Sequence, residues 1–127
     1  MALMDYVLGY QHVGIPTKDI EESTAFYKAL GFEMIYETKN NGNKVRFFSA
    51  KSILIEVYEK EDIAEKRGAI DHVALLVNNI VTVSELAEKE NFKIVEGPHF
   101  LPFWENGVKY ICIEGPNSEI IEFIQKY

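Results

Sequence analysis

The sequence predicts an α+β fold made of two tandem βαβββ modules, and three observations support this prediction. The chain has 127 residues, of which 47% are hydrophobic, and this suits a small globular domain. A set of short motifs occurs twice in the same order. Each copy starts with an apolar β-type run, continues with an amphipathic helical segment and ends in three short β-type runs.

The repeat is defined by matched blocks near the two ends of each copy. Residues 10–15 (YQHVGI) recur as residues 70–75 (IDHVAL), and residues 55–57 (IEV) recur as residues 121–123 (IEF). Matched blocks in one order indicate a duplication. We therefore predict one domain, 1–127, in which module 1 covers about 8–58, a charged linker covers 59–69 and module 2 covers about 70–126.

The first module has clear signals for the ends of its elements. Residues 8–15 read as a strand that stops before Pro16. Asp19 with Glu22 three residues later forms a capping-box pattern, and Gly31 suits the left-handed end of the helix that follows. Three strands are then predicted, with an Asn40–Asn43 turn between the first two: 32–38, 44–49 and 53–58.

The second module repeats this plan. Asn79 is the expected helix cap, and Asn91 takes the position of Gly31 because asparagine also tolerates the left-handed conformation. The predicted elements are a strand at 70–77, a helix at 80–90 and strands near 92–96, 108–114 and 119–125. Residues 97–107 are predicted to be a loop, whose three aromatic residues either cover one end of the core or line a pocket.

Composition excludes several classes of function. Twenty acidic residues against 13 basic ones give a net charge of −7, which argues against a nucleic-acid partner. A single cysteine, Cys112, excludes an intramolecular disulfide and fits a reducing compartment, where we read it as a small buried apolar residue. The first residues do not resemble a secretory signal, and no apolar run approaches the roughly 20 residues of a membrane span. We expect a cytoplasmic protein without a membrane partner.

Two glutamates stand out because their strands are apolar on both faces. Glu56 has Leu54 and Tyr58 beside it on its face of the strand, and Glu122 occupies the equivalent position in the second module. A buried carboxylate costs several kcal/mol unless a cation, a metal or a proton compensates it. The alternative is that both glutamates simply reach the wet face of a sheet.

The histidines strengthen the metal interpretation because two of them are also related by the repeat. A pseudo-twofold relation between the modules would bring their first strands, and therefore His12 and His72, close together. Two imidazoles and two carboxylates suit a divalent first-row metal. The predicted metal ligands are His12, Glu56, His72 and Glu122.

These motifs resemble the vicinal oxygen chelate superfamily (glyoxalase, bleomycin resistance, dioxygenase), and the ligand pattern is similar to that of glyoxalase I. The segments that match are HVGI at 12–15, DI at 19–20, FY at 26–27, LGF at 30–32, DHVA at 71–74, GPNS at 115–118 and IEF at 121–123. The resemblance implies that the modules form a curved, partly open barrel around a metal. It also implies His12, Glu56, His72 and Glu122 as ligands of Ni, Zn or Co, and a homodimer that binds a small-molecule substrate.

The same resemblance implies a reaction. A glyoxalase-I-like lyase/isomerase converts the hemithioacetal of an α-oxoaldehyde and a thiol into a 2-hydroxyacyl thioester through an enediolate. Glu122 is the implied catalytic base, and Glu56 is a ligand that shares this role.

The sequence departs from glyoxalase I at two positions that hold glutathione in that family, because it has Pro16 and Lys60 in place of an arginine and an asparagine. The thiol and the substrate therefore stay open. The alternatives are a methylmalonyl-CoA epimerase-like or other superfamily enzyme and a non-enzymatic protein that binds a drug or metabolite. Candidate substrate contacts are Arg46, Trp104, Asn106 and Lys109.

Overall fold

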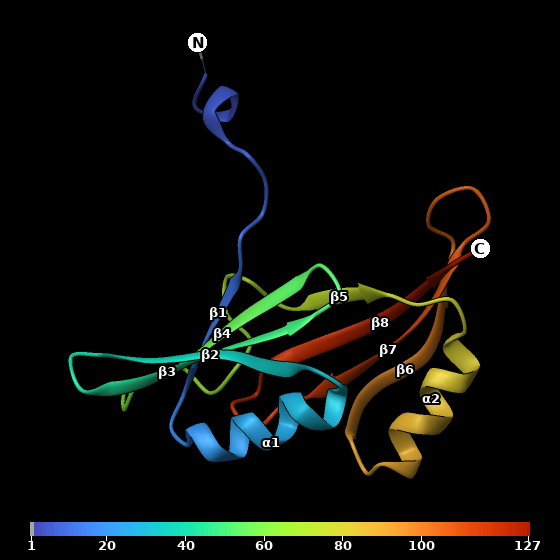
Figure 1. Ribbon diagram of the computed structural model, residues 1–127. Helices are drawn as coiled ribbons and strands as arrows, with labels where there is room; N and C mark the ends of the chain where they lie inside the picture. Colours follow the sequence, from blue (N-terminus) through green and yellow to red (C-terminus); the bar gives the residue numbers. More distant parts are fainter. Residues whose placement is uncertain (1) are drawn as a thin grey trace. The chain divides into compact units, whose positions relative to one another are not determined.

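The computed structural model describes residues 2–127, which divide into two compact units (Figure 1). The first unit ends at Glu61 and the second starts at Asp62. Each unit contains one α-helix and one open four-stranded sheet, so the predicted α+β fold with two βαβββ modules is confirmed. No helix within residues 2–127 has the length and apolar character needed to cross a membrane.

The elements follow the same order in both units. The first unit contains a short 3-10 helix, Leu3–Tyr6, followed by β1 (Val13–Thr17), α1 (Ile20–Leu30), β2 (Glu33–Asn40), β3 (Asn43–Ala50) and β4 (Ile53–Glu59). The second contains β5 (Val73–Leu76), α2 (Ile80–Lys89), β6 (Lys93–Leu101), β7 (Val108–Glu114) and β8 (Ile120–Lys126).

In each sheet the first strand of the unit pairs with the last. The strand orders are β1-β4-β3-β2 and β5-β8-β7-β6. The β1–β4 and β5–β8 pairs are parallel, whereas all the others are antiparallel. The residues opposite Glu56 and Glu122 across the parallel pairs are Gly14 and Ala74.

The helix ends follow the sequence signals, with one exception. Asp19 Oδ1 accepts hydrogen bonds from the backbone N–H groups of Glu21 and Glu22, at 3.0 and 3.1 Å. Glu22 does not complete the capping box, because the Asp19 N–H donates to the Thr17 hydroxyl instead. Gly31 and Asn91 both have positive φ, 104° and 60°, so the predicted left-handed positions are confirmed.

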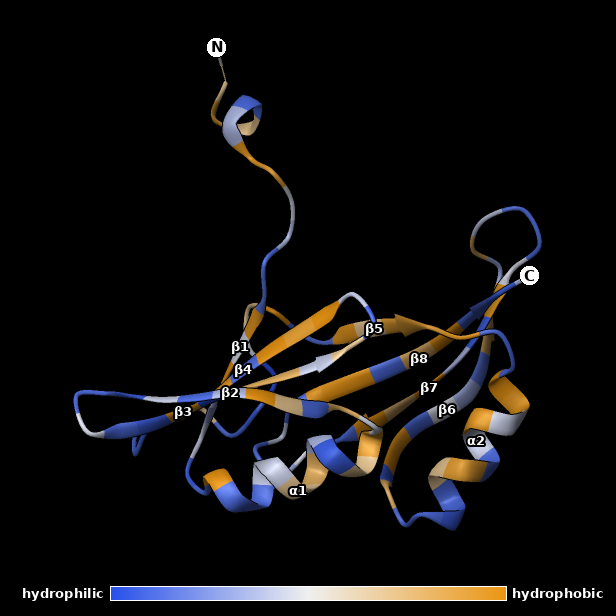
Figure 2. Cartoon of the chain, viewed as in Figure 1, coloured by the Kyte–Doolittle hydropathy of each residue, from blue (hydrophilic) through white to orange (hydrophobic). Residues whose placement is uncertain are grey.

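Each sheet has one face that packs on its helix. In the first unit a buried cluster that includes Tyr27, Phe48, Ile55 and Val57 fills the space between α1 and the sheet. Because side chains alternate along a strand, Glu56 lies on the other face. Figure 2 shows that β8 is likewise a mostly hydrophobic strand that a hydrophilic segment interrupts.

The predicted strands at 8–15 and 70–77 begin too early. β1 starts only at Val13, where its pairing with β4 starts, and residues 2–12 have no strand partner. Leu8, for example, is fully exposed. Pro16 lies within β1 rather than after it, which is possible because β1 is an edge strand. β5 is likewise limited to four residues.

The predicted loop at 97–107 is also wrong in its first half, because β6 continues to Leu101. Register shifts on both sides of Glu96 leave Gly97 and Pro98 outside the ladder, so that a residue without an N–H is accommodated. Gly97 has φ 87°, and a Cβ there would lie 2.5 Å from the Tyr110 carbonyl oxygen. Only glycine fits this close approach.

A pair of phenylalanine substitutions tests the position of the first unit's core. Phe48 is completely buried and Phe103 is 54% exposed. We expect Phe48→Ala to lower the free energy of unfolding by about 3–5 kcal/mol. Phe103→Ala, which removes the same atoms from the surface, should change it by less than about 1 kcal/mol. Urea unfolding followed by circular dichroism measures both, and equal effects would contradict this packing.

Candidate metal centre

The first unit places a histidine beside Glu56. His12 lies two residues before Gly14, the partner of Glu56 across the parallel pair. Its Nε2 atom is 3.6 Å from Glu56 Oε1, while its Nδ1–H donates to the side-chain oxygen of Gln11. The imidazole ring also packs edge-on against Phe47, with 5.8 Å between the centroids. Glu56 is thus paired on the face that α1 does not cover.

The second unit repeats this pair with a charged neighbour. His72 lies two residues before Ala74, the partner of Glu122, and its Nε2 atom is 3.2 Å from Glu122 Oε2. His72 Nδ1–H donates to Asp71 Oδ2 at 2.8 Å. This hydrogen bond holds the pKa of Asp71 below its usual value. Asp71 therefore takes the place that the neutral Gln11 has in the first unit.

The hydrogen bonds at Nδ1 define which nitrogen of each ring is available. A neutral imidazole that donates through Nδ1–H keeps the lone pair on Nε2, and Nε2 is the atom that faces the glutamate in both units. Metal-binding histidines commonly donate their other ring N–H to a carboxylate or carbonyl oxygen. Gln11 and Asp71, which the sequence analysis did not single out, provide this support.

The two carboxylates differ in exposure. The Glu122 side chain is 12% exposed, and the Glu56 side chain is 25% exposed. Over residues 2–127, histidine, cysteine and acidic side chains form no metal-binding group of three or more. Each unit, described by itself, contributes one histidine and one glutamate. The four-ligand set stays a prediction.

Glu122 has further neighbours that sequence reasoning missed. Cys112 is its cross-strand partner on β7, and Glu96 is the partner of Cys112 on β6, so all three lie in one row across the sheet. The Tyr110 hydroxyl donates to Glu96, and this bond together with burial raises the pKa of Tyr110 to about 12. The bulges in β6 set this row, and no sequence pattern reports them.

Two of the candidate substrate contacts lie on the helix-covered faces. Arg46 is opposite Val57, and its guanidinium contacts Glu21 at 2.8 Å as well as Glu37. These carboxylates raise the pKa of Arg46. Lys109 is opposite Gln125, whose side chain accepts a hydrogen bond from the first backbone N–H of α2. Both positions therefore face away from the glutamates.

The other two candidates lie in the loop between β6 and β7. Trp104 is 72% exposed, and the ammonium of Lys126 is 4.6 Å from the centroid of its ring. Asn106 is exposed in the same loop. Within residues 2–127, neither side chain forms a hydrogen bond or a ring contact with Glu122.

The environment of Cys112 generates a pH-dependent prediction. This thiol is 4% exposed, and burial, followed by the nearby charge of Glu122, raises its pKa to about 11. The pKa of Cys112 is higher in the folded state than in the unfolded chain, where it is near 8.5. The contribution of the protonated thiol to the free energy of unfolding is therefore fully present below about pH 8.5. It is lost as the pH rises through about 11.

We therefore expect a thiol-specific disulfide reagent to react with the native protein at pH 8 many times more slowly than with the protein in urea. The chain has one cysteine, so the absorbance change reports Cys112 alone. Equal rates in the folded and unfolded protein would contradict its burial.

Comparison with known proteins identifies the family of the chain. Residues 9–122 match the family described as the Glyoxalase/Bleomycin resistance protein/Dioxygenase superfamily. The uncharacterized protein YwbC of Bacillus subtilis (strain 168) is 35% identical over 124 residues, covering 91% of this chain and 95% of that protein.

Solved structures agree in fold. A glyoxalase family protein from Enterococcus faecalis has a TM-score of 0.79 at 19% identity, covering 94% of this chain and 98% of that one. The fosfomycin resistance protein FosX from Listeria monocytogenes, complexed with Mn(II) and a sulfate ion, has a TM-score of 0.74 at 16% identity, covering 95% and 94%. The chain belongs to the Glyoxalase/Bleomycin resistance protein/Dioxygenase superfamily.

Proposed function

We propose that this protein is a divalent-metal lyase/isomerase of the glyoxalase I type, which converts the hemithioacetal of an α-oxoaldehyde and a thiol into a 2-hydroxyacyl thioester. The observation that supports this proposal is the repeated His–Glu pair, with Nε2 facing a carboxylate oxygen in each unit. Within the proposal, His12, Glu56, His72 and Glu122 together bind one ion. The two pairs come from one chain or from two chains of a homodimer.

The donor atoms fit a divalent ion. Nitrogen and oxygen ligands that share one ion at about 2.0–2.2 Å lie roughly 3.0–3.6 Å apart for ligand–metal–ligand angles between about 90° and 120°. The observed separations are 3.2 Å in the second unit and 3.6 Å in the first. Neutral imidazoles and carboxylates suit Ni, Zn and Co, and the Mn(II) in Listeria FosX supports a divalent ion in this fold.

The proposed chemistry is a proton transfer between two adjacent carbons. A divalent ion held by these residues would polarise the substrate oxygens and so acidify the neighbouring C–H bond. Glu122 accepts the proton from the carbon that bears the sulfur and returns it to the adjacent carbonyl carbon. The first carbon is oxidised to the thioester level while the second is reduced to the alcohol, so no external oxidant is needed.

Glu122 suits the role of the base better than Glu56. Its side chain is half as exposed as that of Glu56, and water competes less for a shielded carboxylate. Tyr110 and Cys112 lie on the same sheet face as Glu122, and both are buried. Glu56, which is more open, is proposed as a ligand that shares the role.

The two arginines bear on the epimerase alternative. A coenzyme A substrate carries phosphates, for which free guanidinium groups are the usual partners. Arg46 is engaged by Glu21 and Glu37, and Arg67 lies 3.8 Å from Asp71 and 4.0 Å from Glu96. Both cations are already near carboxylates, which favours a substrate without phosphates.

Metal uptake tests the four-ligand set directly. We expect the purified protein to bind one equivalent of Ni, Zn or Co, and we expect His72→Ala and Glu122→Gln each to weaken binding by more than tenfold, because each removes one ligand. Isothermal titration calorimetry measures this loss. His99→Ala and Glu88→Gln are matched controls outside both pairs and should bind like the unchanged protein. Equal binding by all five proteins would contradict the set.

Turnover tests the reaction itself. The Ni-, Zn- or Co-loaded protein should convert methylglyoxal with glutathione or bacillithiol into the thioester, followed by the absorbance of the product. Glu122→Gln should lower kcat by at least 100-fold, because the proton acceptor is lost, whereas Glu88→Gln should not change it. A metal-loaded protein that turns over neither adduct would contradict the glyoxalase assignment and favour a binding protein.

A further inference from the structure

Residues 2–10, which we call the N-terminal arm, are apolar and exposed. The arm contains the short 3-10 helix Leu3–Tyr6 and leads toward β1 (Figure 1). Six large hydrophobic side chains of the arm are each more than half exposed: Leu3, Met4, Tyr6, Val7, Leu8 and Tyr10. Folded monomers seldom leave so many apolar side chains of one segment in water. The arm therefore needs a surface that covers it.

The duplication provides an internal comparison for the arm. Residues 2–9 precede β1 in the same way that residues 62–69 precede β5, and both segments are largely exposed. Four of the eight residues in 62–69 are charged, which suits a solvated connection. In 2–9 only Asp5 is charged. Because the second unit has the same architecture behind a charged segment, the βαβββ unit itself does not require an apolar one. The apolar side chains of the arm therefore point to a separate role.

The apolar area of the arm is large enough for a stable interface between two proteins. Two tyrosines and four aliphatic side chains with these exposed fractions present on the order of 600 Å² of apolar surface. In a twofold dimer the same contact is made twice, once by the arm of each copy. Two arms and the surfaces that they cover then reach the roughly 1,200–2,000 Å² that specific, stable interfaces bury.

Charge favours a second copy of the chain over a membrane as the partner of the arm. Segments that lie on membrane surfaces are usually rich in lysine and arginine, and the arm has neither. Asp5 is its one charged residue, and the Asp5 carboxylate accepts a hydrogen bond from the Ala2 N–H at 2.9 Å. Two copies with a net charge of −7 each repel one another, so they approach best where each carries few charges. The arm meets this condition.

We propose that the N-terminal arm is an interaction surface for a second copy of this chain, and that each arm of the resulting homodimer packs on the other copy. The exposed apolar side chains supply the free energy of association, because they leave water only when the two copies meet. The inference concerns the association of the chain and uses neither a metal nor the proposed reaction.

Sedimentation velocity of the full-length protein without added metal tests the association. We expect a dimer with a dissociation constant of about 1 μM or lower. Leu8→Gln should raise this constant by at least about 100-fold, because the change removes a buried leucine from both arms. Leu86→Gln is the matched control, since Leu86 is a half-exposed leucine on α2, and it should not change the dissociation constant. Circular dichroism checks that both variants keep the fold.

Cross-linking shows which chain the arm contacts. The photoreactive amino acid p-benzoylphenylalanine replaces Tyr10, an aromatic residue that is 85% exposed. Protein labelled with the heavy nitrogen isotope is mixed with an equal amount of unlabelled protein, irradiated and analysed by peptide mass spectrometry. If each arm packs on the other copy, about half of the cross-linked peptide pairs should join a heavy chain to a light one, because subunits of the two kinds pair at random.

Three results would overturn the role of the arm: an unchanged protein that sediments as a monomer, a dimer that Leu8→Gln does not weaken, and cross-links that join residues of one chain only. The last result would show that the arm folds back on its own chain. None of these results bears on metal uptake or turnover, so the role of the arm and the proposed function fail separately.

Discussion

The parallel pairing of the first and last strands in each unit is the constraint on which the candidate site depends. This pairing sets Gly14 opposite Glu56 and Ala74 opposite Glu122, and each histidine precedes its small residue by two positions. An imidazole and a carboxylate from distant parts of the sequence therefore meet on one sheet face, while the opposite face packs on the helix. The duplication reproduces the same contact twice, as the separations of 3.6 and 3.2 Å indicate.

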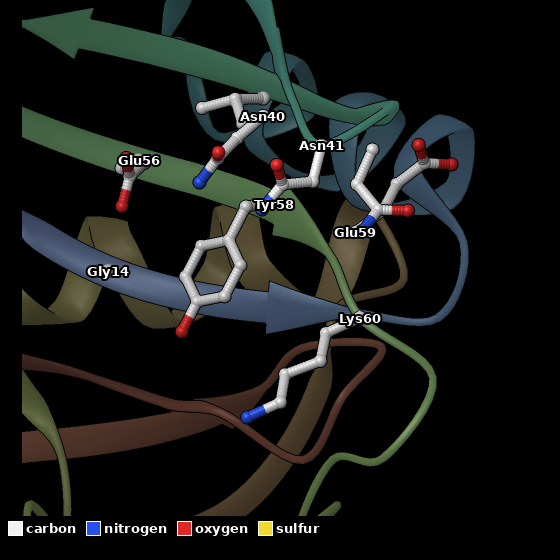
Figure 3. Close-up of a pocket in the computed structure, with 9 residues that line it drawn as sticks. Gly14, Asn40, Asn41, Glu56, Tyr58, Glu59 and Lys60 are labelled. Atoms are coloured by element: carbon white, nitrogen blue, oxygen red, sulfur yellow. The ribbon is translucent and has the colours of Figure 1, made fainter.

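The two copies have nevertheless diverged in ways that suggest different tasks. Asp71 supports His72 with a charge, whereas Gln11 supports His12 without one. Glu122 lies beside the buried Tyr110 and Cys112 and is itself only 12% exposed, which suits a shielded base. The Glu56 side, in contrast, borders a cavity that Tyr58 and Lys60 also line (Figure 3). In the proposed function, the second unit supplies the principal base for the proton transfer.

Where interactions between neighbouring residues decide the structure, the sequence was sufficient to predict it. The caps at Asp19, Gly31 and Asn91 and the Asn41–Gly42 turn, with φ of 50° and 83°, follow from side-chain hydrogen bonds and left-handed conformations that neighbouring residues already specify. Strand 108–114 was predicted with its observed bounds. The wrong predictions concern strand bounds that depend on pairing with another strand. These are the late starts of β1 and β5, and the extension of β6 through two bulges to Leu101. Neither a missing partner strand nor a register shift can be recognised from the residues of the strand itself.

The sequence by itself determined the duplicated α+β architecture and named His12, Glu56, His72 and Glu122, because repeated spacing and a carboxylate within an apolar strand are both visible in one dimension. Only the tertiary structure decided what surrounds them. It placed Arg46 on the α1 face, set Cys112 and Glu96 in the row of Glu122, and aligned Tyr58 and Lys60 beside an open cavity. The reason is physical: which strands pair, and in which register, depends on contacts between segments far apart in the chain, and these contacts decide which side chains share a face.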